Sequence, residues 1–143
     1  LKAMARMDSH RARTDYNLYA GLVGADAAAA DTAFVLARVR QVSAHEVGHT
    51  LGLGHNYIAS SYERGSVMDY PPPRVRLDAR GNIDLSAAYA VGPGPYDVWA
   101  IRWGYTPFPA EREGDSLRAI VREGLTKGFL YLSDADARPD GSS

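Results

Sequence analysis

Apolar side chains recur at helical spacing in the segment that ends near Leu51. A helix turns by about 100° per residue, so residues three or four apart lie on one face. Either Asp26 or Asp31 can cap the N-terminus of this helix, and the pattern predicts that it ends near Leu51. Its expected core-facing arc consists of Val35, Leu36, Val39, Val42, Val47 and Leu51.

Polar residues of the same helix gather beside this arc. On a helical wheel, Arg38, Gln41 and His49 fall close to His45, so the histidines border the predicted core face. Arg38 and Gln41 are either supports for a metal ligand or solvated surface residues. Glu46 falls inside the apolar arc, where a carboxylate is costly unless a cation lies near it. A metal ion held by the histidines would meet that need.

Two further helices are predicted in the C-terminal half. Residues 95–104 should form the first, because proline favours the first position of a helix and glycine the position past its end. Residues 115–126 should form the second, followed by a short strand or extended run at 129–132 and a flexible tail at 133–143. The expected buried positions are Tyr96, Val98, Trp99, Ile101 and Trp103 in the first helix, and Leu117, Ile120, Val121 and Leu125 in the second.

The composition is that of an ordinary globular domain. With 143 residues, 45% apolar and 23% charged, the chain is long enough for one domain and too short for two. Its formal net charge of −1 gives no reason to expect nucleic acid or an anionic membrane as a partner. The sequence has no cysteine, which excludes disulfides and thiolate metal sites. No apolar run approaches the roughly 18 residues of a membrane span.

Three of the four histidines lie between His45 and His55, at spacings that suit zinc. His45 and His49 are one helical turn apart, so both can point at one ion. A hydrolytic zinc site takes three protein ligands and leaves the fourth position to water. His55 is the candidate third ligand, and Gly52 tolerates the left-handed conformation that turns the chain back. Glu46 follows the first ligand directly, so its carboxylate is the candidate general base.

This pattern, H-E-x-x-H-x-x-G-x-x-H, resembles the long zinc signature of the metzincin metallopeptidases. A second motif, Ser-Val-Met-Asp-Tyr at residues 66–70, resembles the Met-turn of that clan. The resemblance implies that Met68 forms a hydrophobic floor beneath the metal. The tyrosine two residues after the methionine is similar to the astacin and serralysin form, which implies that Tyr70 lies at or near the zinc.

The resemblance covers residues 26–105, including a tryptophan-bearing helix similar to the C-terminal helix of metzincins. Asn56, directly after the third histidine, departs from astacins, matrixins and adamalysins. The implied fold is an α+β, metzincin-like zincin catalytic domain. Because the stretch before His45 is too short for the twisted sheet of that fold, we expect a single, partial domain that is mostly helical, with the N-terminal sheet largely missing.

The resemblance implies a zinc-dependent endopeptidase that hydrolyses peptide bonds with a metal-activated water. Zn²⁺ is the implied cofactor, Glu46 the general base and Tyr70 the donor to the oxyanion. The expected partner is a peptide or protein substrate, with the missing N-terminal part of the domain as a further candidate. The resemblance also implies an extracytoplasmic location, either secreted or periplasmic.

A non-catalytic zinc-binding fragment, or an interaction module derived from a metalloprotease, is the alternative. A fourth protein ligand would favour it, because structural zinc sites are closed by four protein ligands. Glu63 and Asp69 are the candidates for that ligand.

Overall fold

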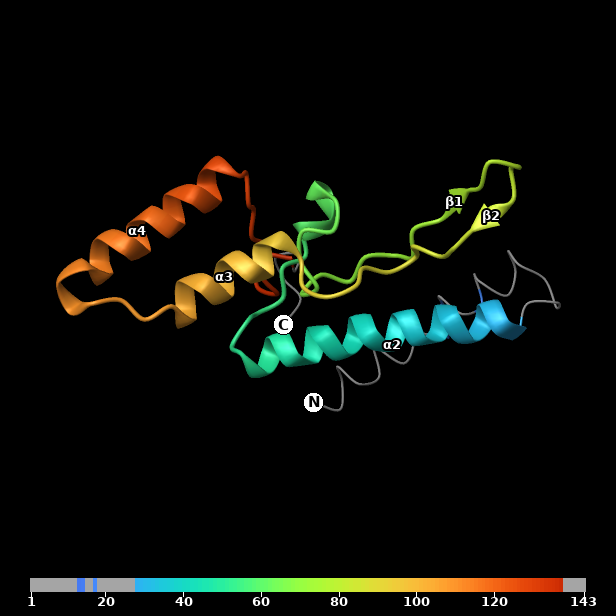
Figure 1. The fold of residues 1–143 in the computed structure, drawn as a ribbon, viewed down its shortest axis with the longest axis horizontal. Coiled ribbons are helices and arrows are strands. Elements are labelled where there is room, and N and C mark those ends of the chain that lie inside the picture. Colours follow the sequence, from blue (N-terminus) through green and yellow to red (C-terminus); the bar gives the residue numbers. More distant parts are fainter. Residues whose placement is uncertain (1–12, 15–16, 18–27, 138–143) are drawn as a thin grey trace. The chain divides into compact units, whose positions relative to one another are not determined.

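The computed structural model of the chain describes residues 13–14, 17 and 28–137. These residues form a mostly helical α+β arrangement, as the sequence predicts, and their only sheet is a two-stranded hairpin. Figure 1 shows the elements, which in chain order are helix α2 (Ala28–Thr50), the 3₁₀ helix η1 (Ala59–Tyr62), strands β1 (Arg76–Leu77) and β2 (Ile83–Asp84), and helices α3 (Pro95–Tyr105) and α4 (Ala110–Thr126).

The chain divides into two compact units, Leu1–Gln41 with Pro72–Val91 and Val42–Pro71 with Gly92–Ser143, and α2 contributes to both. The first unit has an apolar core in which Phe34 packs against Tyr89, with ring centroids 5.3 Å apart. Ala88 completes this core. The Arg38 guanidinium lies 5.4 Å from the centre of the Tyr89 ring and donates to the Gln41 side chain. Both polar residues are buried, so neither is a solvated surface residue.

The first unit also contains the hairpin. Leu77 of β1 pairs with Ile83 of β2 in antiparallel register. In the turn, the Asp78 carboxylate accepts hydrogen bonds of 2.8 Å from the backbone N–H groups of Arg80 and Asn82. These local hydrogen bonds fix the turn that joins the two strands.

Helices α3 and α4 pack together in the second unit (Figure 1). Their contact is centred on Trp99, whose indole N–H donates to the carbonyl of Ile120 at 2.7 Å. Gly124 permits this approach, because an added Cβ would lie 2.5 Å from the indole ring. The start of α3 at proline agrees with the prediction, whereas α4 begins five residues earlier than position 115.

The predicted buried stripes of these two helices are only partly correct. Trp103 is 48% exposed and Leu125 is 71% exposed. The reason is that the helices touch mainly around Trp99, so apolar positions away from that contact stay at the surface. Val98 and Val121 are also exposed.

The predicted core-facing arc of α2 is wrong. Five of its six members, all but Val42, are exposed. The buried face is instead the stripe of Phe34, Arg38, Gln41, His45 and Gly48. Later segments cover this stripe with both apolar and polar groups: Tyr89 packs on Phe34, Met68 packs on Gly48, and the Val67 carbonyl bonds to His45. Polarity therefore does not mark the outer face of the helix. The helix ends at Thr50, close to the predicted end, and it already includes Asp31, which therefore is not its N-cap.

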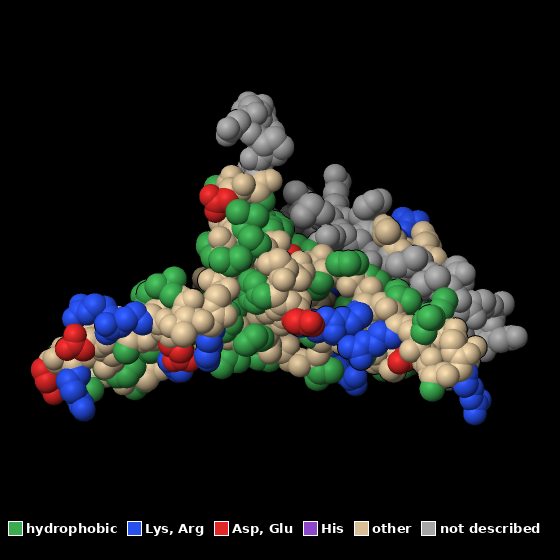
Figure 2. Space-filling view, turned by 90° about the horizontal axis from the view of Figure 1, so that it is seen from above, with side chains coloured by type: hydrophobic (Ala, Val, Ile, Leu, Met, Phe, Trp, Pro, Cys, Tyr) green, Lys and Arg blue, Asp and Glu red, His purple; other side chains and the backbone are tan. Residues whose placement is uncertain are grey.

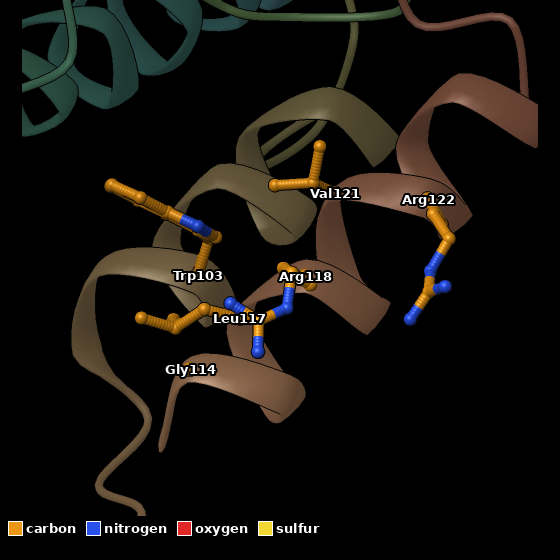
Figure 3. Close-up of a pocket in the computed structure, with 6 residues that line it drawn as sticks. All are labelled: Trp103, Gly114, Leu117, Arg118, Val121 and Arg122. Carbon is orange, nitrogen blue, oxygen red and sulfur yellow. The ribbon is translucent and has the colours of Figure 1, made fainter. Parts of the chain in front are cut away.

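Two pockets in the second unit are lined by residues other than the predicted metal ligands. One has a cavity volume of about 500 Å³ and is lined by Trp103 of α3 together with Gly114, Leu117, Arg118, Val121 and Arg122 of α4 (Figure 3). The other, of about 480 Å³, is lined by residues 51–54, several residues of α3, Val121 and Tyr131. Neither of these two pockets is lined by a histidine.

The surface carries charges of both signs. Figure 2 shows acidic, basic and hydrophobic side chains interspersed on one face. Among the described residues, no helix is both long and apolar enough to cross a membrane.

Candidate metal centre

Helix α2 and the loop after it bring the three predicted ligands together. His45 and His49 lie near the C-terminal end of the helix, on adjoining turns. Gly52 has a φ of 81°, the left-handed conformation predicted for it, and the chain then returns to place His55 beside the helical pair. One ring nitrogen of each histidine lies within 4.8 Å of the other two. The structure thus forms a compact three-histidine cluster.

The Nδ1 atom of each ring is hydrogen-bonded to an acceptor. Nδ1 of His45 lies 2.7 Å from the carbonyl oxygen of Val67, and Nδ1 of His49 lies 2.9 Å from that of Leu53. Nδ1 of His55 lies 2.9 Å from a carboxylate oxygen. Carbonyl and carboxylate oxygens only accept hydrogen bonds, so each neutral ring carries its proton on Nδ1 and a lone pair on Nε2.

In this tautomer, the Nε2 atoms face one another with no hydrogen atom between them. Those of His49 and His55 lie 3.2 Å apart, and the buried Nε2 of His45 has no hydrogen-bond partner among the described residues. Burial is the main cause that lowers the pKa of His45, which favours the neutral form that a metal ligand needs. Converging lone pairs in a buried site are unfavourable unless a cation lies between them. Three imidazole rings with one nitrogen each within 4.8 Å of the others fit Zn²⁺.

Met68 packs against the helix at the position of Gly48. The methionine side chain is fully buried, and a Cβ added to Gly48 would overlap its sulfur atom. Gly48 stands between the two helical ligands, so its missing side chain lets the methionine reach the helix backbone there. The carbonyl of Met68 also accepts from the backbone N–H of Asn56 at 3.0 Å. The predicted floor thus contacts both segments that carry the histidines.

Asp97 of α3 holds this turn in place. Its side chain is 2% exposed and accepts hydrogen bonds from the Ser66 hydroxyl and, at 2.8 Å, from the N–H of Val67. It also accepts from the N–H of Gly94 at 2.7 Å and so caps the N-terminus of its own helix. One buried carboxylate therefore joins α3 to the carbonyl that orients His45. In the sequence, the only signal for this residue is its acidic type in the first turn of a helix.

Tyr70 and Glu46 lie beside the cluster. The Tyr70 hydroxyl is 3.1 Å from Nε2 of His55, which is the nitrogen available to a metal. The Tyr70 ring also packs against His45, with ring centroids 4.7 Å apart. The Glu46 side chain is exposed, and its charge acts to raise the pKa of His45 against the larger effect of burial. A proton donor thus adjoins Nε2 of His55, and the Glu46 carboxylate is near enough to His45 for its charge to act on that ring.

Asn56 links the loop of the cluster to the chain that follows α4. Its side-chain amide donates to the carbonyl of Leu130 at 2.9 Å and accepts from the N–H of Leu132 at 3.1 Å. The N–H of Tyr57 donates to the carbonyl of Leu132 at 3.0 Å. Residues 129–132 therefore form an extended run rather than a strand, which was one of the two predicted alternatives.

The same segment places Asp134 next to His55. Nδ1 of His55 lies 3.0 and 2.9 Å from the two carboxylate oxygens of Asp134, and the Tyr57 hydroxyl donates to this carboxylate at 2.8 Å. Asp134 belongs to the stretch that was predicted to be a flexible tail. No local sequence pattern connects it with His55, which is 79 residues away. Residues 138–143 of that tail lie outside the described residues.

The two candidates for a fourth protein ligand do not join the cluster. The Asp69 carboxylate is buried and accepts from the backbone N–H groups of Ser60 and Tyr70, both at 2.7 Å. Glu63 is exposed and has a positive φ of 68° at the end of η1. Among the described residues, the cluster therefore contains three protein ligands and no fourth, the number found in hydrolytic zinc sites.

A known family matches most of the chain. A family model described as Met-zincin matches residues 27–143. Searches with the chain found no matching curated protein and no matching solved structure. The family match extends beyond the motifs recognised in the sequence and includes the segment that carries Asp134.

Proposed function

Because the chain belongs to the Met-zincin family, we propose that it is a zinc-dependent endopeptidase with Glu46 as its general base. The observation that carries this proposal is the convergence of three histidine rings, each hydrogen-bonded at Nδ1 to an oxygen atom. A bound Zn²⁺ supplies a Lewis acid that polarises a carbonyl group and lowers the pKa of water. His45, His49 and His55 are the residues that would hold it.

The chain's own residues supply the proton transfers. Glu46 is exposed beside the cluster, so it can accept a proton from an attacking water and pass it to the leaving amine. The Tyr70 hydroxyl, close to Nε2 of His55, can donate to the oxygen that becomes negative as the peptide bond is attacked. Met68 supports the helix that carries His45 and His49 by packing at Gly48, and Asp97 supports His45 by binding Val67.

The same proposal includes the partner and the location. The proposed substrate is a peptide or a protein. The proposed location is extracytoplasmic, on the basis of the resemblance to metzincin metallopeptidases.

The substitution Glu46→Gln tests the proposal. Zinc content, measured by elemental analysis, should stay at the wild-type level, because Glu46 is not one of the clustered ligands. Cleavage of a peptide library should fall by about 100-fold or more, which is the usual cost of losing a general base. Glu111→Gln in the first turn of α4 is the matched control and should change neither quantity.

Three outcomes have distinct meanings. Cleavage that survives Glu46→Gln at the wild-type rate would remove the general-base role. A wild-type chain that binds zinc and cleaves nothing would support the alternative of a non-catalytic zinc-binding module. A chain without zinc affinity would contradict the metal centre itself.

A further inference from the structure

We infer that Asp134 is a positioning residue for the metal centre, which holds the imidazole of His55 in the orientation that presents Nε2 to the ion. The inference rests on the zinc site of the proposed function and adds a residue from outside the zinc signature. It gives the segment after α4 a supporting role in metal binding, through His55.

The three histidines are oriented in two different ways. His45 and His49 project from a helix, and their Nδ1 atoms donate to backbone carbonyls of Val67 and Leu53. His55 lies in an irregular loop, and its Nδ1 faces the Asp134 carboxylate at 2.9 Å, with the Tyr57 hydroxyl 3.1 Å from the same nitrogen. A charged acceptor makes a stronger hydrogen bond than a neutral carbonyl. The ligand with the least backbone support therefore has the strongest orienting partner.

The position of Asp134 is itself fixed by neighbours of His55. The Tyr57 hydroxyl donates to the carboxylate at 2.8 Å, and its backbone N–H donates to Leu132. Asn56, which is fully buried, bonds to the same segment through its side-chain amide. Two successive residues after the ligand thus hold the segment that carries the carboxylate. This arrangement is expected of an orienting group, since a mobile carboxylate would fix no ring.

The geometry distinguishes an orienting role from direct ligation. Asp134 contacts Nδ1, whereas the nitrogens that converge with those of His45 and His49 belong to the opposite edge of the ring. A carboxylate at Nδ1 fixes the tautomer and raises the basicity of Nε2. The expected consequence is tighter zinc binding, with no bond between Asp134 and the ion.

The test is the zinc affinity of the 143-residue chain, measured by competition with a chromophoric chelator. Asp134→Ala should weaken zinc binding by about 10- to 100-fold, the usual effect of losing such a partner. Asp134→Asn should lose less, because its amide oxygen can still accept the hydrogen bond from Nδ1 without the charge. Asp136→Ala is the matched control, since the Asp136 carboxylate binds Ser133 in the same turn.

A second measurement separates orientation from structural support. In the zinc-free protein, ¹⁵N NMR of the imidazole should show His55 with its proton on Nδ1, and Asp134→Ala should shift it toward a mixture of tautomers. The Asp134 side chain is 52% exposed, so we expect the zinc-free variant to keep its helices by circular dichroism. A variant that loses its fold before zinc is added would overturn the inference in favour of a purely structural role.

The remaining outcomes are also decisive. If the wild-type chain binds zinc and Asp134→Ala binds it equally well, Asp134 has no positioning role and the proposed function stands. If Asp136→Ala loses as much affinity as Asp134→Ala, the effect belongs to the segment as a whole and the inference is wrong. If the wild-type chain binds no zinc, the proposed function and this inference fail together.

Discussion

The buried face of α2 contains Arg38, Gln41 and His45, whereas the exposed face contains Val35 and Val39. Polarity and burial are thus reversed relative to the usual amphipathic helix. The buried polar groups tolerate this because most have partners: Arg38 bonds to Gln41, and Nδ1 of His45 bonds to a backbone carbonyl. The comparison teaches that burial along this helix follows the contacts that later segments make with it rather than its apolar content.

Among the substitutions considered below, Asp97→Ala should cause the largest loss in the free energy of unfolding. Asp97→Ala leaves the N–H groups of Val67 and Gly94 and the Ser66 hydroxyl without their acceptor in a buried site. We expect a loss of about 3 kcal/mol or more in the free energy of unfolding, measured in urea. Zinc affinity should fall as well, because the carbonyl of Val67 orients His45.

A matched control for Asp97 is available on α4. Asp115→Ala removes an exposed carboxylate that pairs with Arg118, and such surface pairs contribute between 0 and about 1 kcal/mol. Equal losses for the two aspartates would show that the buried polar network does not stabilise the protein more than its surface does.

Adding one methyl group to the buried face should have an intermediate effect. In Gly48→Ala, the new Cβ overlaps the sulfur of Met68, which is fully buried and has little room to move. Overpacking of this kind costs about 1 to 3 kcal/mol. The loss should shrink when Gly48→Ala is combined with Met68→Ala, as a double-mutant cycle would measure.

Gly114→Ala on α4 is the control for the glycine substitution. Its new Cβ would lie 3.5 Å from the nearest Arg118 atom, an ordinary contact, so the better helix propensity of alanine should prevail. The expected gain is about 0.5 to 1 kcal/mol. Stabilisation by Gly48→Ala as well would contradict the close packing of methionine and helix.

The exposed face should respond least. Val39→Thr replaces a methyl by a hydroxyl with nearly the same shape and helix propensity, at a side chain that is 53% exposed. We expect a change of less than about 0.5 kcal/mol in the free energy of unfolding. Val67→Thr, at a position that is 5% exposed, is the matched control and should cost about 1 to 3 kcal/mol. A similar cost for Val39→Thr would show that this face is covered in solution.

Local patterns predicted the parts of the site that depend on neighbouring residues. The four-residue spacing of His45 and His49, the left-handed turn at Gly52 and the start of α3 at Pro95 all follow from helix geometry and backbone sterics. The same reasoning gave the wrong face of α2, because it assumed that apolar residues are buried. The buried face of a helix depends on which other segments pack against it, and the sequence of the helix alone does not specify those segments.

By itself, the sequence determined the candidate metal ligands: three histidines, a glycine turn that brings the third one back to the helix, and no cysteine to compete. Only the tertiary structure decided which groups support the ligands. Asp97 reaches Val67 from 30 residues away, and Asp134 reaches His55 from 79 residues away. Motif spacing records contacts within one turn or loop, whereas hydrogen bonds between distant segments depend on how the whole chain folds, so no local pattern could specify them.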